Sequence, residues 1–337
     1  MRALPDASAG AWLRAATAAE MSAGLRWYVP SGYPVLLRIF PPFELDRPIG
    51  TDWPTLEAAI ERDPHAVTLP PTETAHATWA QTAARFGRTM HPLAQSHALL
   101  GVDYGSSETR VDADGWRYET HFEGRMPPAA LAALARLLAD RTSTPTDAVA
   151  AFWNGWSDGP AGGAPGEDAT FTVRRRRRWW PWPGHRGGVV AMPRRYVTFS
   201  PGSDDEPRPR MRRFRRFRAR PGLRPGSGVE HPPPNELGLT DREHLLFATT
   251  LDEIADPTWP RRAPWAGSGS DDSPVTPSIL WPADRAWVLV QEVDCDTAVL
   301  ACSAETAGVV LASPDLEAAE IGYDADLGPW GDAINAP

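Results

Sequence analysis

The chain of 337 residues is 42% hydrophobic and contains 15 Trp, 10 Phe and 6 Tyr, which is enough for a sizeable core and excludes a wholly disordered protein. Its formal charge of −9 argues against a surface that wraps nucleic acid over its whole extent. All 34 basic residues are Arg, and the absence of Lys excludes Schiff-base chemistry and a phosphate-loop lysine.

Helical patterns dominate the first half of the chain. An Ala-rich pattern predicts a helix within residues 7–24, and Tyr33–Phe40 predicts a buried strand that ends at two prolines. Four further helices are expected: one after Pro54, one from about Thr74 to Gly87, one over residues 127–138, and one that begins at Thr144 and ends in Phe152, Trp153 and Trp156.

Strand patterns dominate the second half. Strands are predicted at 194–200, at 286–293 and at 244–251, although Thr240 and Glu243 would also cap a helix in that last region. A helix is expected over 304–312. Residues 201–234 predict a mobile Arg/Pro/Gly-rich insertion, and 256–278 a Pro/Gly/Ser-rich loop. The order predicts one interrupted α+β domain, residues 1–337, with helices mainly in the N-terminal half and an antiparallel or mixed sheet built largely from later strands.

The remaining composition favours a soluble, cytoplasmic protein. Asp6, Arg14 and Glu20 interrupt the N-terminal apolar positions, so no signal peptide is expected, and the longest apolar stretch is too short to span a membrane. Cys295 and Cys302 are expected to be reduced thiols. No motif indicates a cofactor, and nothing in the sequence sets an oligomeric state.

Three blocks together resemble a known family. They are Phe152–Gly159 (F-W-N-G-W-S-D-G), the strand patterns around Tyr196 and Phe247, and Ser278–Thr297 (S-I-L-W-P-A-D-R-A-W-V-L-V-Q-E-V-D-C-D-T). The chain resembles, over most of residues 30–325, a family of uncharacterised proteins from high-GC Gram-positive bacteria with a W-x-G-W block before a late L-W-W-P-x-D-R-A-W strand ending in E-I-D-F-D. It departs from that pattern at Pro282, at Cys295 and in its Arg-rich expansion. The resemblance implies a cytoplasmic bacterial protein and no particular reaction.

One carboxylate cluster is a candidate metal site. Glu292, Asp294 and Asp296 occupy alternate positions after the strand predicted at 286–293, and alternation in an extended chain would place them on one face. Their oxygens are ligands suited to Mg²⁺ or Mn²⁺, and metal-assisted hydrolysis would be the matching chemistry. The alternative is that the acids cap turns or pair with Arg, for which Arg285 is the nearest candidate.

The most distinctive feature is a cationic segment, residues 174–224, with 17 Arg and three acids for a formal charge of +14. The other 286 residues hold 17 Arg and 40 acids, a formal −23. Guanidinium groups interleaved with aromatic rings suit phosphates and exposed bases, and they also suit an anionic membrane surface. Further alternatives are that the segment folds back on the acidic remainder, or that it is a solvated insertion. The candidate polyanion-binding residues are Arg174, Arg175, Arg176, Arg177, Arg178, Trp179, Trp180, Arg212, Arg213, Phe214, Arg215, Arg216, Phe217 and Arg218.

The sequence contains no complete catalytic motif. The leading hypothesis is therefore a soluble binding or interaction protein that contacts nucleic acid or another polyanion through residues 174–224. The alternatives are a divalent-metal-dependent hydrolase that uses the carboxylate cluster, and a structural protein with a solvated insertion.

Overall fold

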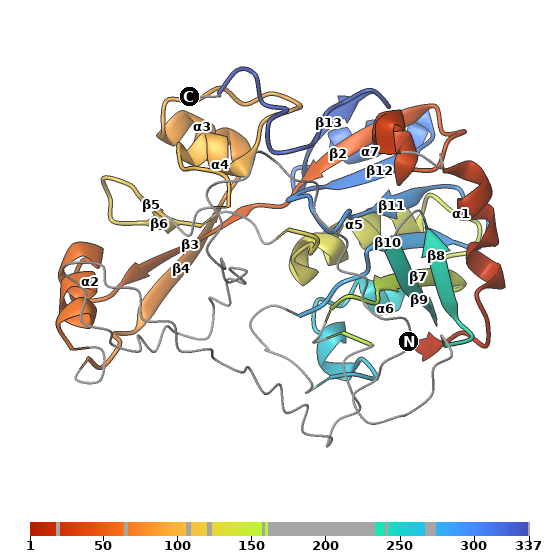
Figure 1. Ribbon diagram of the computed structural model, residues 1–337, viewed down its shortest axis with the longest axis horizontal. Coiled ribbons are helices and arrows are strands. Elements are labelled where there is room, and N and C mark those ends of the chain that lie inside the picture. The colour runs from red at the N-terminus through yellow and green to blue at the C-terminus, as the bar shows by residue number, and fades with distance from the viewer. Residues whose placement is uncertain are drawn as a thin grey trace, which may run out of the picture.

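The computed structural model describes residues 1–17, 21–63, 67–105, 109–119, 123–156, 159–160, 233–239, 242–266 and 274–335. Two antiparallel sheets organise these residues, and they are joined where β2 (Val35–Phe40) leads into β3 (Phe43–Pro48) (Figure 1). The described ranges contain seven α-helices, five of them before residue 140. The predicted α+β class, with helices mainly in the N-terminal half and a sheet built largely from later strands, is confirmed.

The large sheet has the strand order β1-β9-β7-β10-β11-β12-β2-β13, and β8 also pairs with β9. Every neighbouring pair printed in this order is antiparallel. Besides β2, its strands are β1 (Arg2–Ala3), β7 (Ala148–Trp153), β8 (Glu236–Leu239), β9 (Arg242–Thr249), β10 (Ile279–Pro282), β11 (Val288–Val290), β12 (Ala298–Cys302) and β13 (Glu317–Ile321).

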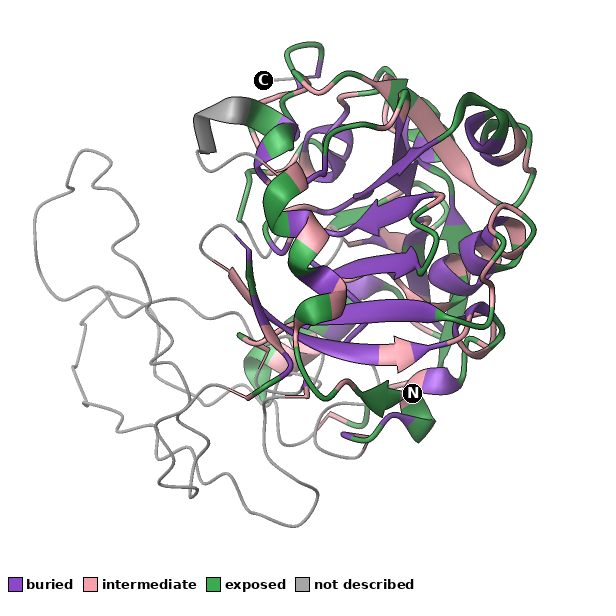
Figure 2. Cartoon of the chain, turned by 90° about the vertical axis from the view of Figure 1, so that its right-hand side faces the viewer, coloured by how far each residue is buried: buried purple, intermediate pink, exposed green. Residues whose placement is uncertain are grey.

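Both faces of the large sheet are covered, which explains why its central strands are buried along their length (Figure 2). Helices α5 (Pro128–Ala139), α6 (Leu251–Ile254) and α7 (Ala304–Leu311) pack on one face, where η3 (Trp259–Arg262) contributes the buried Trp259. The N-terminal segment covers the other face with η1 (Ser8–Gly10), α1 (Ala11–Ala16) and η2 (Met21–Trp27), and it buries Leu13 and Leu25 there.

The small sheet has the order β4-β3-β6-β5, with β4 (Thr72–Ala77), β5 (Arg110–Val111) and β6 (Arg117–Tyr118). Helices α2 (Trp53–Arg62), α3 (Trp79–Arg85) and α4 (Ser96–Leu100) belong to the same region (Figure 1). Trp79 is fully buried between Phe40 and Phe43, and its indole nitrogen donates to the carbonyl oxygen of Pro41 at 2.8 Å. This ring therefore ties α3 to the chain segment that links the two sheets.

The helix predicted from Thr144 to Trp156 is wrong, because this stretch forms strand β7. Residues 148–152 are all buried, since β7 lies between β9 and β10 and both faces of the sheet are covered. A short apolar run without alternation fits a buried strand as well as a helix, and the pairing with two neighbours decided between them. The start signal at Thr144 and Asp147 belongs to a turn, in which the Asp147 nitrogen donates to the Thr144 carbonyl at 3.1 Å.

Two other boundaries differ from the predictions. The helix expected from Thr74 begins only at Trp79, where Thr78 and Gln81 form a capping box, and residues before it form β4. The strand predicted at 286–293 is confined to β11, Val288–Val290. In both regions the sequence pattern continues across a helix cap or a turn, whereas the helix or strand stops there.

Other elements agree with the predictions. The helices after Pro54, over 127–138 and over 304–312 appear as α2, α5 and α7, and the strands at 33–40 and 244–251 appear as β2 and β9. The strand predicted at 194–200, the insertion at 201–234 apart from its last two residues, and residues 267–273 of the loop at 256–278 lie outside the described residues. No helix in the described part of the chain combines the length and apolar character that a membrane crossing requires. The single interrupted domain stays a prediction.

Candidate functional site at one edge of the large sheet

The three predicted carboxylates lie on the turn that connects β11 to β12, not on an extended strand. The backbone nitrogen of Cys295 donates to the carbonyl of Glu292 at 3.1 Å, which folds the chain back. The Gln291 side chain, 2% exposed, fills the turn and donates from Nε2 to the carbonyls of Cys295 at 2.8 Å and Thr297 at 3.2 Å. The expectation that alternation places the carboxylates on one face is therefore wrong, because strand pairing ends at Val290.

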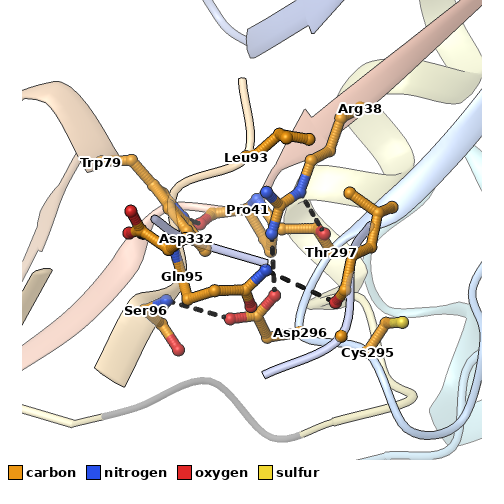
Figure 3. A network of polar contacts seen from close by, with 12 residues as sticks. Arg38, Pro41, Trp79, Leu93, Gln95, Ser96, Cys295, Asp296, Thr297 and Asp332 are labelled. Atoms are coloured by element: carbon orange, nitrogen blue, oxygen red, sulfur yellow. Dashed lines mark hydrogen bonds and ion pairs between the residues drawn. The ribbon is translucent and has the colours of Figure 1, made fainter. Parts of the chain in front are cut away.

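Asp296 forms a buried ion pair with Arg38 of β2 (Figure 3). The Arg38 side chain is fully buried: its Nη2 lies 3.3 Å from Asp296 Oδ1, its Nε donates to Thr297 Oγ1 at 2.7 Å and its Nη1 donates to the Pro92 carbonyl at 3.0 Å. The other Asp296 oxygen accepts from the Ser96 nitrogen at the start of α4, at 3.2 Å. Asp296 thus joins the large sheet to the helices beside the small one.

Glu292 and Asp294 share a different partner, Arg242 at the start of β9. Arg242 Nη2 lies 3.0 Å from Glu292 Oε1 and also pairs with Asp294, and its guanidinium lies 5.4 Å from the centre of the Trp153 ring. Burial raises the pKa of Glu292, and the charge of Arg242 opposes this shift. The predicted partner Arg285 instead lies over the Trp12 ring at 4.9 Å.

These ion pairs bear on the candidate metal site. The two arginines engage oxygens of all three carboxylates: Arg38 pairs with Asp296, and Arg242 pairs with Glu292 and Asp294. Within the described ranges, no group of three or more His, Cys, Asp or Glu side chains is arranged to hold a metal ion. Metal binding by Glu292, Asp294 and Asp296 stays a prediction.

A fourth carboxyl group, Glu123, lies near the same turn. Burial raises the pKa of Glu123 to about 7; a hydrogen bond from Tyr104 opposes the shift, and the charges of Asp296 and Asp294 add to it. The next residue, Gly124, donates its backbone nitrogen to the Cys295 carbonyl at 2.8 Å, so this segment packs directly on the turn. A carboxyl group with a pKa near 7 can exchange a proton under neutral conditions.

The described strands that precede and follow the cationic segment in the sequence are β7 and β8. All the candidate polyanion-binding residues, Arg174–Arg178, Trp179, Trp180, Arg212, Arg213, Phe214, Arg215, Arg216, Phe217 and Arg218, lie outside the described residues. Strands β7 and β8 pair with opposite edges of β9. Trp153 of β7 and Leu237 of β8 are both register partners of His244 in β9. Asn154 Nδ2 donates to Glu236 Oε2 at 2.8 Å, so the points where the chain leaves and rejoins the sheet are joined directly.

Sequence patterns alone missed several members of this site. Arg38 lies in an apolar strand and Arg242 in an ambiguous one, and neither belongs to a motif. Gln291 and Glu123 gave no signal, because their roles depend on the turn formed by residues 291–297. The W-x-G-W block was the available clue, since Trp153 lies against Arg242 and Trp156 lies near Gly124.

No family model, curated protein or solved structure matches this chain. The resemblance drawn from the three sequence blocks therefore stays a prediction.

Proposed function

We propose that the protein binds a polyanion, namely nucleic acid, through the Arg/aromatic segment at residues 174–224. The observation that carries the proposal is the segregation of charge: +14 within 51 residues, against −23 for the rest of the chain. A surface that neutralises several phosphates releases the counterions condensed on the nucleic acid, and this release drives association. A dense cluster of guanidinium groups is suited to that role.

The composition of the segment supports nucleic acid over a simpler polyanion. Five consecutive Arg precede Trp179 and Trp180, and a second group of Arg surrounds Phe214 and Phe217. Guanidinium groups bind phosphate in two-point fashion, while aromatic rings stack on unpaired bases regardless of sequence. The pattern favours single strands, whose bases are free to stack.

The flanking strands support the proposal from the described part of the molecule. The segment is inserted between two strands that pair with the same neighbour, β9, and that are linked by the hydrogen bond from Asn154 to Glu236. An insertion whose ends are held together leaves the pairing of the sheet intact.

A mobility-shift titration across a salt series tests the proposal, with single-stranded DNA, duplex DNA, RNA and heparin as probes. Binding is expected to be strongest at about 50 mM salt. The logarithm of the association constant should fall linearly with the logarithm of the salt concentration, with a slope of about −0.7 per neutralised phosphate for single strands and about −0.9 for duplex. Absence of binding at about 50 mM salt overturns the proposal. Equal affinity for heparin and for single-stranded nucleic acid would show that the segment recognises negative charge alone and not bases.

Two variants with the same change in net charge provide the control. The first replaces Arg174–Arg178 with Gln, and it should reduce both affinity and the salt slope. The second makes five Arg→Gln changes at exposed positions of the described body, Arg2, Arg14, Arg62, Arg110 and Arg261, and it should change neither greatly. An equal loss in both variants would show that binding follows net charge and not the segment.

A further inference from the structure

Strand β4 forms one edge of the small sheet, where β3 is its neighbour in the described structure (Figure 1). The two strands pair in continuous register along all six residues of β4, without a bulge. No proline interrupts Thr72–Ala77, and four of its residues are exposed, namely Thr72, Glu73, Thr74 and His76. An edge strand of this length and regularity is a template on which another strand can pair, unless a proline, a bulge or a covering segment prevents it.

The hydrogen-bonding pattern between β3 and β4 shows which backbone groups of β4 point outward. The Ile49 nitrogen donates to the Pro71 carbonyl at 2.9 Å, which continues the register of the two strands by one pair. Hydrogen-bonded pairs alternate along an antiparallel ladder, so every second residue counted from Pro71 points its backbone groups at β3. The N–H and C=O groups of Thr72, Thr74 and His76 therefore point away from β3. Within the described residues, these groups have no hydrogen-bond partner.

The three outward residues are spaced symmetrically about Thr74, so a second copy of the same strand can pair with all of them. When Thr74 of one copy lies opposite Thr74 of the other in antiparallel orientation, Thr72 of each copy lies opposite His76 of the other. Each of these pairs can exchange two backbone hydrogen bonds, which gives about six across the interface. Every outward N–H and C=O group of the strand is then paired.

The residues on either side of β4 favour this register over its neighbours. Pro70 has no N–H to donate, and the Thr78 nitrogen already donates to Gln81 Oε1 at 2.8 Å in the capping box of α3. A shift of the pairing by two residues would place Pro70 or Thr78 opposite an outward residue. Such a shift leaves one fewer complete pair than the register centred on Thr74.

The side chains of β4 also suit pairing with an identical strand. In the register centred on Thr74, Glu73 lies opposite the small Ala75 of the second copy. The Glu73 carboxylate is neutralised within its own chain, because it pairs with Arg47 of β3 at 2.6 Å. No two like charges therefore face each other directly, and the hydroxyls of the two Thr74 side chains can form a hydrogen bond across the pair.

We propose that two copies of the protein associate through β4, so that their small sheets form one continuous antiparallel sheet. Pairing along one short strand buries less surface than a standard protein interface, so the dimer is expected to be weak and reversible. The proposal goes beyond polyanion binding and does not rest on it. A dimer carries two cationic segments, and a nucleic acid that contacts both is held more tightly than by one.

Sedimentation velocity of the full chain without nucleic acid tests the association, and amide hydrogen exchange followed by NMR locates it. The sedimentation coefficient should rise with protein concentration, and the amides of Thr72, Thr74 and His76 should become protected over the same range. The amides of Glu73 and Ala75 should change little, because they already donate to β3. A chain that stays monomeric up to millimolar concentration overturns the proposal and leaves the edge to an extended peptide. A dimer whose three outward amides stay unprotected overturns it as well.

Two variants at Thr74 form a matched pair. Thr74→Pro removes an N–H group that points outward and no hydrogen bond to β3, so the small sheet should stay intact. It should weaken dimerisation by at least about tenfold, because each copy loses the donor at the centre of the interface. Thr74→Ala keeps this N–H group and should dimerise nearly as well as the parent. Equal dimerisation of the parent and the proline variant overturns the proposal, as does an equal loss in both variants. Hydrogen exchange of the unaltered chain decides the question even if Thr74→Pro fails to fold.

Discussion

The buried pair between Arg38 and Asp296 offers the sharpest test of how the two sheets are held together. The pair is 3.3 Å apart, with side chains 0% and 8% exposed. Asp296→Asn keeps the shape of the side chain and an oxygen that can accept from the Ser96 nitrogen, but it removes the negative charge. Arg38→Met keeps an unbranched side chain and removes the positive charge. Each variant therefore leaves one buried charge without its partner.

The expected cost follows from burial. Removing one partner of a buried pair destabilises a protein by about 3–5 kcal/mol, because the remaining charge keeps its desolvation penalty. Arg38→Met should lie at the upper end, since it also removes the donors to Thr297 Oγ1 and the Pro92 carbonyl. The double variant should cost less than the sum of the two single variants, with a coupling energy of about 1–3 kcal/mol. An exposed pair of the same type contributes about 0–1 kcal/mol.

Urea unfolding followed by Trp fluorescence measures these free energies, and the buried Trp79 and Trp281 report on the small and large sheets. Arg262→Met is the matched control, because Arg262 and Asp256 form an ion pair with side chains 54% and 42% exposed. Single-variant losses of less than about 1 kcal/mol, no larger than this control, would refute the reasoning. Additive losses in the double variant would also refute it, since they would show that the two side chains do not act as a pair.

Three further outcomes are expected. The pKa of Glu123 is raised to about 7, so the contribution of this group to stability is present below about pH 4.5 and is lost as the pH rises to about 7. Glu123→Gln should therefore be more stable than the parent at pH 8, by about 1–2 kcal/mol after solvent screening, and urea unfolding at several pH values measures this difference. Gly124→Ala should destabilise the protein by about 1–3 kcal/mol in thermal unfolding, because φ is +74° and a Cβ would lie 2.7 Å from Val293 Cα. The control Gly50→Ala should destabilise it less, because Gly50 has a similar φ of +82° but open space around it among the described atoms. Calorimetric titration with Mg²⁺ or Mn²⁺ should give no saturable heat, because arginines engage the carboxylates; saturable heat that Asp294→Asn abolishes would establish the predicted metal site.

The sequence predicted those elements whose pattern is decided locally. Helix α5 carries leucines at spacings of three and four after two prolines, and α7 follows Ser303, whose side chain accepts from the Thr306 nitrogen. Strand β7 failed, because its apolar run is compatible with a helix and only the pairing with β9 and β10 selects a strand. The residues of β7 alone do not determine whether this stretch forms a helix or a strand, because strand formation depends on packing against neighbouring strands.

The candidate site was predicted only in part, for a related reason. The acids of residues 292–296 were recognised as a cluster, but their partners Arg38 and Arg242 lie about 258 and 50 residues away in the sequence. The Gln291 amide acquires its function only when the turn closes around it. Interactions between distant residues of this kind depend on topology, and the sequence pattern does not encode them.

The ion pairs of the described body also bear on polyanion binding, because the segment at 174–224 has intramolecular competitors. The 286 residues outside this segment hold 40 acids and 17 Arg, and pairs such as Arg38–Asp296 and Arg242–Glu292 already use some of these acids. Duplex DNA presents one negative charge per about 1.7 Å of its axis. We therefore expect the closely spaced phosphates of nucleic acid to compete most strongly at low salt with these acids for the 17 Arg of the segment.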